Sequence, residues 1–283
     1  MASKIRLAPS MAIIWTHCSK RYNVLAEAQQ LGYAEADPTL DIEGVDAAHK
    51  LAILASIAFG IPLQFDKVYI EGISRITQDD VAYAAKLGYR IKHLGIARRD
   101  QNGVQLRVHP TLIPQRQLLA NVNGVMNAVL VKGDAVGQSL FYGAGAGAEP
   151  TASAVVADII DVVRTLTADP ENRVPHLAFQ PDALSDLPVL PMAAVETACY
   201  LRLLALDRPG VLADITRILA DCGISIEAFV QKEAPPTANE VPVVLLINPV
   251  KEQRMNEAIA AIEALDSIRA PVMRIRLEYL DSD

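Results

Sequence analysis

The C-terminal part of the chain, from Thr197 to Asp283, shows the pattern that most restricts the fold. Runs rich in branched apolar residues alternate with two amphipathic segments in the order strand, helix, strand, strand, helix, strand. The predicted strands cover residues 198–206, 224–232, 241–248 and 272–280, and the predicted helices cover residues 210–223 and 252–265. This order is that of the ferredoxin-like βαββαβ unit, so we expect an α+β domain over residues 197–283.

A second predicted domain covers residues 23–170 and combines helices with a mixed sheet. Residues 1–22 show no clear period and are expected to form a poorly ordered or weakly docked atypical segment, and residues 171–196 are proline-rich and are expected to be a linker. The turns "DQNG" and "KGD" predict two hairpins. The predicted elements are helices over 23–33, 45–59, 77–88 and 150–166, a strand over 68–73, and hairpins over 89–114 and 127–147.

Composition excludes several classes of function. The chain has 283 residues, is 51% hydrophobic and carries a net charge of −7, and no basic stripe with interleaved aromatic residues points to nucleic-acid binding. Its three cysteines are widely spaced and its five histidines do not fall at ligand spacing, so we expect no metal site and a reducing, cytoplasmic location. The longest apolar run, residues 51–63, is too short to cross a membrane.

The run "GYAEADPTLDIEGVDAAHK", residues 32–50, places many carboxylates at the start of an apolar helix. Asp46 and Lys50 are four residues apart and share one face of that helix, and Asp41 lies about a turn earlier or caps the helix. A lysine on a largely buried helix needs a partner. One interpretation is a surface ion pair beside a solvated acidic loop. The other is a pocket for a small cationic substrate in which the lysine transfers a proton.

These residues resemble a known family. The same run resembles the signature of homoserine dehydrogenase, in which Asp-Pro-x-x-Asp is followed by Gly-x-Asp-x-x-x-Lys, and "GVMNAVLVKGDAVGQSLFYGAGAGAEPTASAVVADIID" resembles a later stretch of that family. The resemblance extends from about Asn23 to Arg164. The C-terminal part resembles an ACT domain, an amino-acid-sensing module, through "LDRPGVLADIT" and "GISIE".

The resemblance assigns roles to individual positions. It implies that Lys50 exchanges a proton with the substrate oxygen, that Asp46 accompanies it and helps to hold substrate, and that Glu35 binds the substrate amino group. Asp41 matches a further acid of the substrate pocket, and Gly147 in "GAGAG" matches a glycine that lies against the nicotinamide of NADP or NAD. Glycine permits such close approach of a backbone, although the same run alone also fits a flexible turn before a helix. The implied substrates are L-homoserine and L-aspartate 4-semialdehyde.

The predicted ACT site lies at the start of the first helix of that domain. Backbone N–H groups after the Pro209–Gly210 turn, beginning with Val211, favour a carboxylate, and Asp207 is placed to take an ammonium group. The alternative is a turn that only caps the helix. The resemblance favours a small amino acid, with threonine first, bound between two copies. We also expect a homodimer that forms through the hairpin sheet, since an uncovered sheet face is often covered by a second copy.

The family also begins with a Rossmann domain that holds the dinucleotide, and no room for one precedes Glu35. "GAGAGA" follows a hairpin and does not match the Gly-x-Gly-x-x-Gly fingerprint. The expectation from sequence is therefore a truncated chain that is inactive alone. Two hypotheses follow: a homoserine dehydrogenase by family, or a non-catalytic dimerising fragment that binds an amino acid.

Overall fold

The computed structural model describes residues 2–8, 37–167, 173–175, 177–231 and 239–279. These residues fall into two compact units. Unit 1 comprises residues 1–74, 92–109 and 116–190, and unit 2 comprises residues 75–91, 110–115 and 191–283. Strands β3 (Tyr89–Arg99) and β4 (Val104–Pro114) contribute residues to both units. The domain boundaries expected from the sequence remain predictions.

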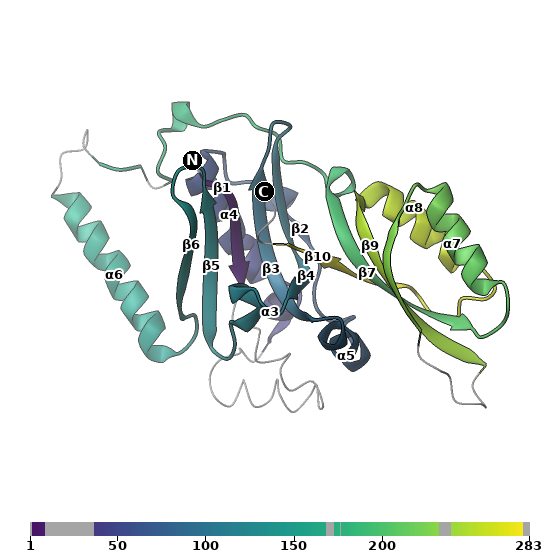
Figure 1. Cartoon of the computed structure of the whole chain (residues 1–283). Helices are drawn as coiled ribbons and strands as arrows, with labels where there is room; N and C mark the ends of the chain where they lie inside the picture. The colour runs from purple at the N-terminus through teal and green to yellow at the C-terminus, as the bar shows by residue number, and fades with distance from the viewer. Residues whose placement is uncertain (1, 9–36, 168–172, 176, 232–238, 280–283) are drawn as a thin grey trace. The chain divides into compact units, whose positions relative to one another are not determined.

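Unit 1 is built on an antiparallel sheet with the strand order β6-β5-β1-β3-β4 (Figure 1). Strand β1 (Ala2–Ala8) lies between β3 and β5, and the short β2 (Tyr69–Ile70) runs parallel to β4. Strands β5 (Met126–Gly133) and β6 (Gly137–Ala144) form the second hairpin in continuous register. Both predicted hairpins are thus confirmed. In each, the turn between the two strands has the short length that antiparallel neighbours need.

Helix α4 (Val45–Phe59) supplies the core of unit 1. Its small and apolar residues, including Ala48, Leu51 and Ala55, are fully buried against the strands. The helix ends at Gly60, whose φ of 63° is left-handed, and this is the common way for a helix to stop. The predicted bounds of this helix are confirmed. The residues of β3 and β4 that pack in the same cluster are Ala97, Val104, Leu106 and Val108.

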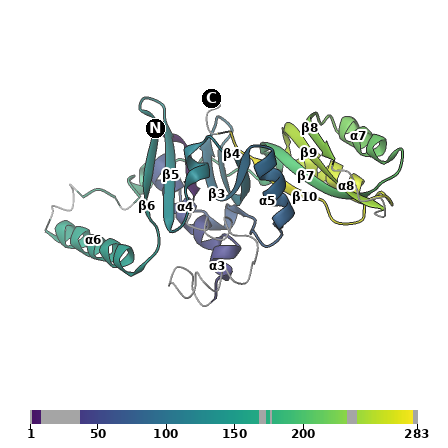
Figure 2. The same ribbon diagram turned by 60° about the horizontal axis from the view of Figure 1, so that its bottom comes forward.

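Helix α6 (Ala148–Leu166) differs from α4, because none of its described residues is buried. It lies beyond β6 in both views of the ribbon (Figures 1 and 2). It begins two residues before the predicted start at Pro150. Its apolar residues are therefore left uncovered in the single chain.

Unit 2 contains the predicted βαββαβ arrangement. The strand order is β10-β7-β9-β8, and β10 also runs parallel to the last part of β4. Alternate residues of β7, from Cys199 to Ala205, pack under α7 and α8, which cover that face of the sheet (Figure 1). The elements are β7 (Glu196–Leu206), α7 (Val211–Asp221), β8 (Ile226–Gln231), β9 (Glu240–Lys251), α8 (Glu252–Glu263) and β10 (Met273–Leu277).

Three local expectations differ from the structure. Residues 2–8 form strand β1 although the sequence shows no clear period there, because pairing with β3 and β5 on both sides fixes their extended backbone. The acidic loop contains a one-turn helix, α3 (Thr39–Ile42), and the predicted strand 68–73 is reduced to two paired residues. The predicted helix over 23–33 lies outside the described residues.

Unit 2 also includes helix α5 (Gln78–Lys86), which begins at a capping box. The Thr77 hydroxyl accepts a hydrogen bond from the Asp80 amide, and the Asp80 carboxylate accepts one from the Thr77 amide. Two orphan N–H groups are thereby satisfied, which confirms Thr77 as the N-cap. Gly88, with a φ of 82°, follows the end of the helix.

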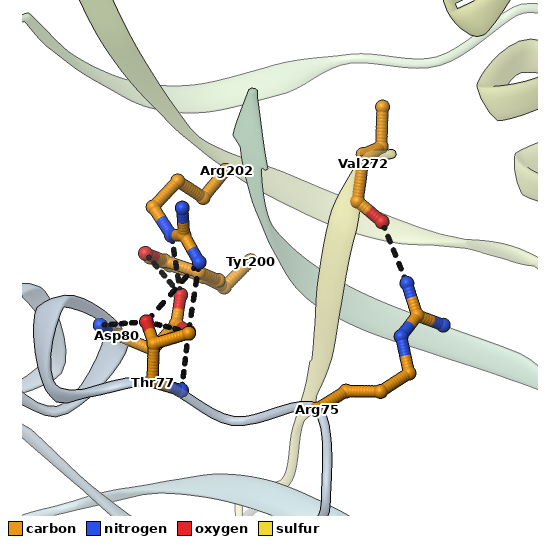
Figure 3. A network of polar contacts seen from close by, with 6 residues as sticks. All are labelled: Arg75, Thr77, Asp80, Tyr200, Arg202 and Val272. Atoms are coloured by element: carbon orange, nitrogen blue, oxygen red, sulfur yellow. Dashed lines mark hydrogen bonds and ion pairs between the residues drawn. The ribbon is translucent and has the colours of Figure 1, made fainter. Parts of the chain in front are cut away.

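The carboxylate of Asp80 is fully buried and holds α5 against strand β7 (Figure 3). Arg202 donates to both of its oxygens, with Nε 2.6 Å from Oδ1 and Nη2 3.0 Å from Oδ2, and the Tyr200 hydroxyl donates to Oδ1 at 3.2 Å. Burial raises the pKa of the Asp80 carboxyl, but hydrogen bonds from Arg202 and Thr77 outweigh that effect and hold the pKa below its usual range. The buried charge is therefore kept ionised by its donors.

Replacing Asp80 by Asn is expected to lower the free energy of unfolding at pH 7 by about 2–3 kcal/mol, since Arg202 loses its partner inside the protein. Because the folded pKa lies below the unfolded value of about 3.9, this stabilisation is present above that value and is lost as the pH falls through the folded pKa. Urea unfolding from pH 7 down to pH 2 measures it. The exposed Asp182→Asn variant is the control, and equal stability of all three proteins at pH 7 would contradict the assignment.

Candidate functional site

Of the acidic residues predicted from the sequence, Asp41 and Asp46 lie on two consecutive helices of unit 1. Asp41 is in α3, and Asp46 is in the first turn of α4. The Lys50 Nζ atom lies 2.6 Å from Asp46 Oδ2, as the four-residue spacing predicts. Asp41 lies about one turn before α4, and its carbonyl accepts a hydrogen bond from the Gly44 amide at 3.2 Å.

Lys50 has the partner that a lysine on this largely buried helix was expected to need, and it lies at the surface. Its side chain is 53% exposed and that of Asp46 is 39% exposed. The buried face of α4 is formed instead by residues such as Ala48 and Leu51. An exposed pair of this kind contributes only a few tenths of a kcal/mol to stability, about 0.3–0.5 kcal/mol. The pair therefore adds little to the stability of the fold, and both side chains are accessible to a ligand.

A glycine, Gly44, separates the two helices that carry these acids. Its φ of 81° is left-handed, and it is the N-cap of α4 without any side-chain hydrogen bond. Residues with a Cβ rarely adopt this conformation, so glycine here permits the sharp change of direction between Asp41 and Asp46. His49 points away from Lys50 and stacks on Phe65 with 3.8 Å between the ring centroids.

The glycine run that the resemblance assigns to the nicotinamide cofactor leads from β6 into α6. Gly147 is the N-cap of α6 and has a φ of 117°, and the nearest atom to a Cβ added there is Pro150 Cδ at 3.5 Å. Gly145 lies directly under the Asn127 amide, which leaves no room for a Cβ. Within this run Gly143, Ala144 and Gly145 are exposed, and Ala146 and Gly147 are half-buried.

The predicted ACT residues come together at the turn between β7 and α7. Gly210 is the N-cap of α7 with a left-handed φ of 95°, and no side chain caps the helix. Val211 is buried in the core, whereas Asp207, Pro209 and Gly210 are exposed. The first N–H groups of α7 thus face an open turn, which is the geometry expected of an anion site and also of a plain helix start.

Other candidate groups contribute little. Glu35 and Cys18 lie outside the described residues. Burial raises the pKa of the Cys199 thiol to about 12, so this cysteine packs in the core as a neutral group. In the described part of the chain, no group of three or more His, Cys, Asp or Glu side chains is placed to hold a metal ion. Among the helices described, none combines the length and apolar character that a membrane crossing requires.

Two residues near these sites were missed by the sequence argument. Asn127, in β5, pairs with Gly143 in the hairpin register and packs on Gly145, and His93, in β3, packs on Gly44. Both contacts join residues far apart in the sequence. No local pattern such as a helix period or a turn signal could have revealed them.

Comparisons with known proteins define the family. The homoserine dehydrogenase family model matches residues 9–160, and the ACT domain model matches residues 200–264. A homoserine dehydrogenase of Pseudomonas aeruginosa is 68% identical over 259 residues, which are 92% of this chain and 60% of the relative. One from Neisseria gonorrhoeae is 54% identical over 91% of this chain and 59% of the relative.

Solved structures agree. A homoserine dehydrogenase from Thiobacillus denitrificans superposes with a TM-score of 0.90 at 62% identity, and covers 98% of this chain and 64% of that chain. One from S. aureus gives a TM-score of 0.68 at 28% identity. The chain thus belongs to the homoserine dehydrogenase family of oxidoreductases of amino-acid biosynthesis and carries an ACT domain. It spans about 60% of the length of the curated relatives that it matches.

The exposure of the Asp46–Lys50 pair predicts that its loss leaves the fold intact. Lys50→Ala is expected to change the free energy of unfolding by no more than about 0.5 kcal/mol. Chemical denaturation measures this change. Arg164→Ala, which removes the exposed pair of Arg164 with Asp161 away from the acidic residues, is the matched control. A loss of several kcal/mol in Lys50→Ala alone would mean that the pair serves the fold.

Proposed function

We propose that this chain supplies the substrate pocket and the proton-transfer groups for the interconversion of L-homoserine and L-aspartate 4-semialdehyde. The observation that carries the proposal is the exposed Asp46–Lys50 pair, in which Lys50 Nζ lies 2.6 Å from Asp46 Oδ2. The pair lies on α4, the helix that follows the short helix containing Asp41. The two charged groups of this pair are exposed and lie one turn apart on α4, close in sequence to Asp41. Family membership supports the same assignment.

The proposed roles follow from charge and reach. Glu35, Asp41 and Asp46 carry negative charges that suit the ammonium group of the amino acid. Lys50 accepts the proton of the homoserine hydroxyl during oxidation, and as an ammonium group it returns a proton to the aldehyde oxygen during reduction. Asp46 keeps the amine of Lys50 oriented through its hydrogen bond.

The homoserine dehydrogenase family is NAD(P)-dependent, and the nicotinamide, when bound, exchanges hydride with the substrate carbon that carries the oxygen. The residues of this chain proposed to lie against it are those of the run from Gly143 to Gly147. Gly143, Ala144 and Gly145 are exposed, and Gly147 has a positive φ of 117°, which residues with a side chain rarely adopt.

Two proposals extend beyond the pocket. The first is that these 283 residues alone do not turn over homoserine, since hydride transfer needs a nucleotide held in place. The second is that the chain forms a homodimer and binds an amino acid, with threonine first, at the ACT turn. A cytoplasmic location remains a prediction.

The catalytic proposal is tested by following NADPH absorbance with homoserine and NADP⁺ as substrates. We expect no turnover by the chain alone, and turnover after a dinucleotide-binding domain of the kind that the family resemblance implies is fused in front of Met1, which keeps strand β1. In that fusion Lys50→Ala is expected to lose on the order of a hundredfold in kcat. Glu35→Gln should mainly raise KM, because it removes binding and not proton transfer. Near-full activity of Lys50→Ala would contradict the assigned role.

The homodimer is expected to form through the surface that α6 and β6 leave uncovered. The α6 residues Val155, Ile159 and Leu166 are 53%, 57% and 70% exposed, and Phe141 of β6 is 64% exposed. A face this apolar is typical of an interface between subunits. Light scattering at micromolar concentration should report a dimer for the native chain and a weakened dimer for Ile159→Asp, with the charge-neutral exposed Thr216→Ser variant as control. A monomeric native chain would overturn this proposal.

Threonine binding at the ACT turn is expected to survive in this chain whether or not it is catalytically active. Titration calorimetry on the whole chain should detect threonine at millimolar concentration or below. Asp207→Asn should weaken binding about tenfold, because it removes the negative charge offered to the ammonium group. No heat with threonine, isoleucine, methionine or serine would leave the ACT domain as an assembly module.

A further inference from the structure

The junction between α3 and α4 determines where the proposed catalytic groups lie. Asp41 precedes this junction, and Asp46 and Lys50 follow it within the first turns of α4. Gly44 occupies the junction in a left-handed conformation and receives no side-chain cap. A glycine without a cap is conformationally free by itself, so the direction of α4 relative to Asp41 depends on what packs around Gly44.

His93 of strand β3 packs on this glycine. A Cβ added to Gly44 would lie 2.6 Å from His93 Cε1 and 3.0 Å from Nε2, so the imidazole occupies the space that any other residue would need. The histidine is only 3% exposed. The buried ring thus packs directly against the backbone of the junction and limits its movement.

The orientation of the ring is fixed from the other side. His93 Nε2 lies 3.0 Å from the carbonyl oxygen of Glu71, and since a carbonyl only accepts, Nε2 carries the proton and donates. Burial lowers the pKa of His93, which outweighs the opposing influence of Glu71 and Glu43 and keeps the ring neutral. No hydrogen-bond partner for Nδ1 is found among the described residues.

Residues 71–74, which include the carbonyl that orients His93, also contact the junction directly. The Ser74 hydroxyl donates to the Glu43 carboxylate, the Ile73 amide donates to the Ile42 carbonyl at 3.0 Å, and Gly72 lies against the Glu43 side chain. Residues 71–74 therefore contact the junction on one side and His93 on the other. The three parts form a closed set of contacts around Gly44.

We propose that His93 is a positioning residue that acts through Gly44 to hold Asp46 and Lys50 in register with Asp41 for binding of the substrate. This rests on the proposed function of those three groups. His93 itself reaches the junction and not the carboxylates, so its effect is on geometry. The competing interpretation is a core histidine that stabilises unit 1 without affecting the acidic pocket.

Three variants of the whole chain separate the two interpretations. His93→Ala removes the ring, and His93→Gln keeps an N–H donor where Nε2 stands. Ile96→Ala is the control for general destabilisation, because Ile96 is 1% exposed, lies on the same strand and points to the opposite face. If His93→Ala does not fold, His93→Asn replaces it, since its shorter amide does not reach the Glu71 carbonyl. Thermal unfolding, L-homoserine calorimetry and amide hydrogen exchange are measured for each.

The proposal expects at least a tenfold loss of homoserine affinity in His93→Ala, recovery to within about threefold in His93→Gln, and no change in Ile96→Ala despite a lower Tm. It also expects amides from Glu43 to Lys50 to exchange about tenfold faster in His93→Ala alone. Equal affinity in His93→Ala, or losses that follow Tm in all variants, would overturn it. If the native chain binds no homoserine, the proposed function fails, and hydrogen exchange alone then tests the role of His93. Unchanged exchange at the junction in His93→Ala overturns that role. Faster exchange in His93→Ala alone supports it.

Discussion

The left-handed turn at Gly44 is the constraint on which the candidate site depends. It lets a one-turn helix that carries Asp41 be followed at once by a long helix that carries Asp46 and Lys50. The long helix is anchored by its buried face, where Ala48 and Leu51 have no exposed surface. The charged groups are therefore presented to solvent by an element that cannot move without opening the core of unit 1.

The buried carboxylates of Asp80 and Glu252 in unit 2 stand in contrast to this exposed pair. Glu252 is 2% exposed and accepts hydrogen bonds from Arg276 and Thr197, and Asp80 accepts them from Arg202 and Tyr200. In each case burial raises the pKa of the carboxyl, and the donors around it outweigh that effect and lower the pKa. Such groups serve the fold, because the removal of a partner strands a charge. Asp46 and Lys50 lack that role, which is why a functional assignment suits them.

Patterns over a few neighbouring residues predicted much of this arrangement. They could not predict contacts between residues that are far apart in the sequence. The bounds of α4, the cap at Thr77 and the Asp46–Lys50 pair follow from spacings of a few residues. Strand β1 was missed because its conformation comes from neighbours more than eighty residues away, at Ile96 and Val129. The contact of His93 with Gly44 and the Asp80–Arg202 pair were missed for the same reason. Periodicity predicts which face of an element is apolar but not which distant residue covers it.

A crystal structure of this chain with L-homoserine tests the central claim most directly. The account predicts the amino acid beside the start of α4, with its hydroxyl oxygen within hydrogen-bond distance of Lys50 Nζ and its ammonium group facing the carboxylates of Asp41 and Asp46. Homoserine bound with its hydroxyl turned away from Lys50, or found only at the turn before α7, would contradict the account.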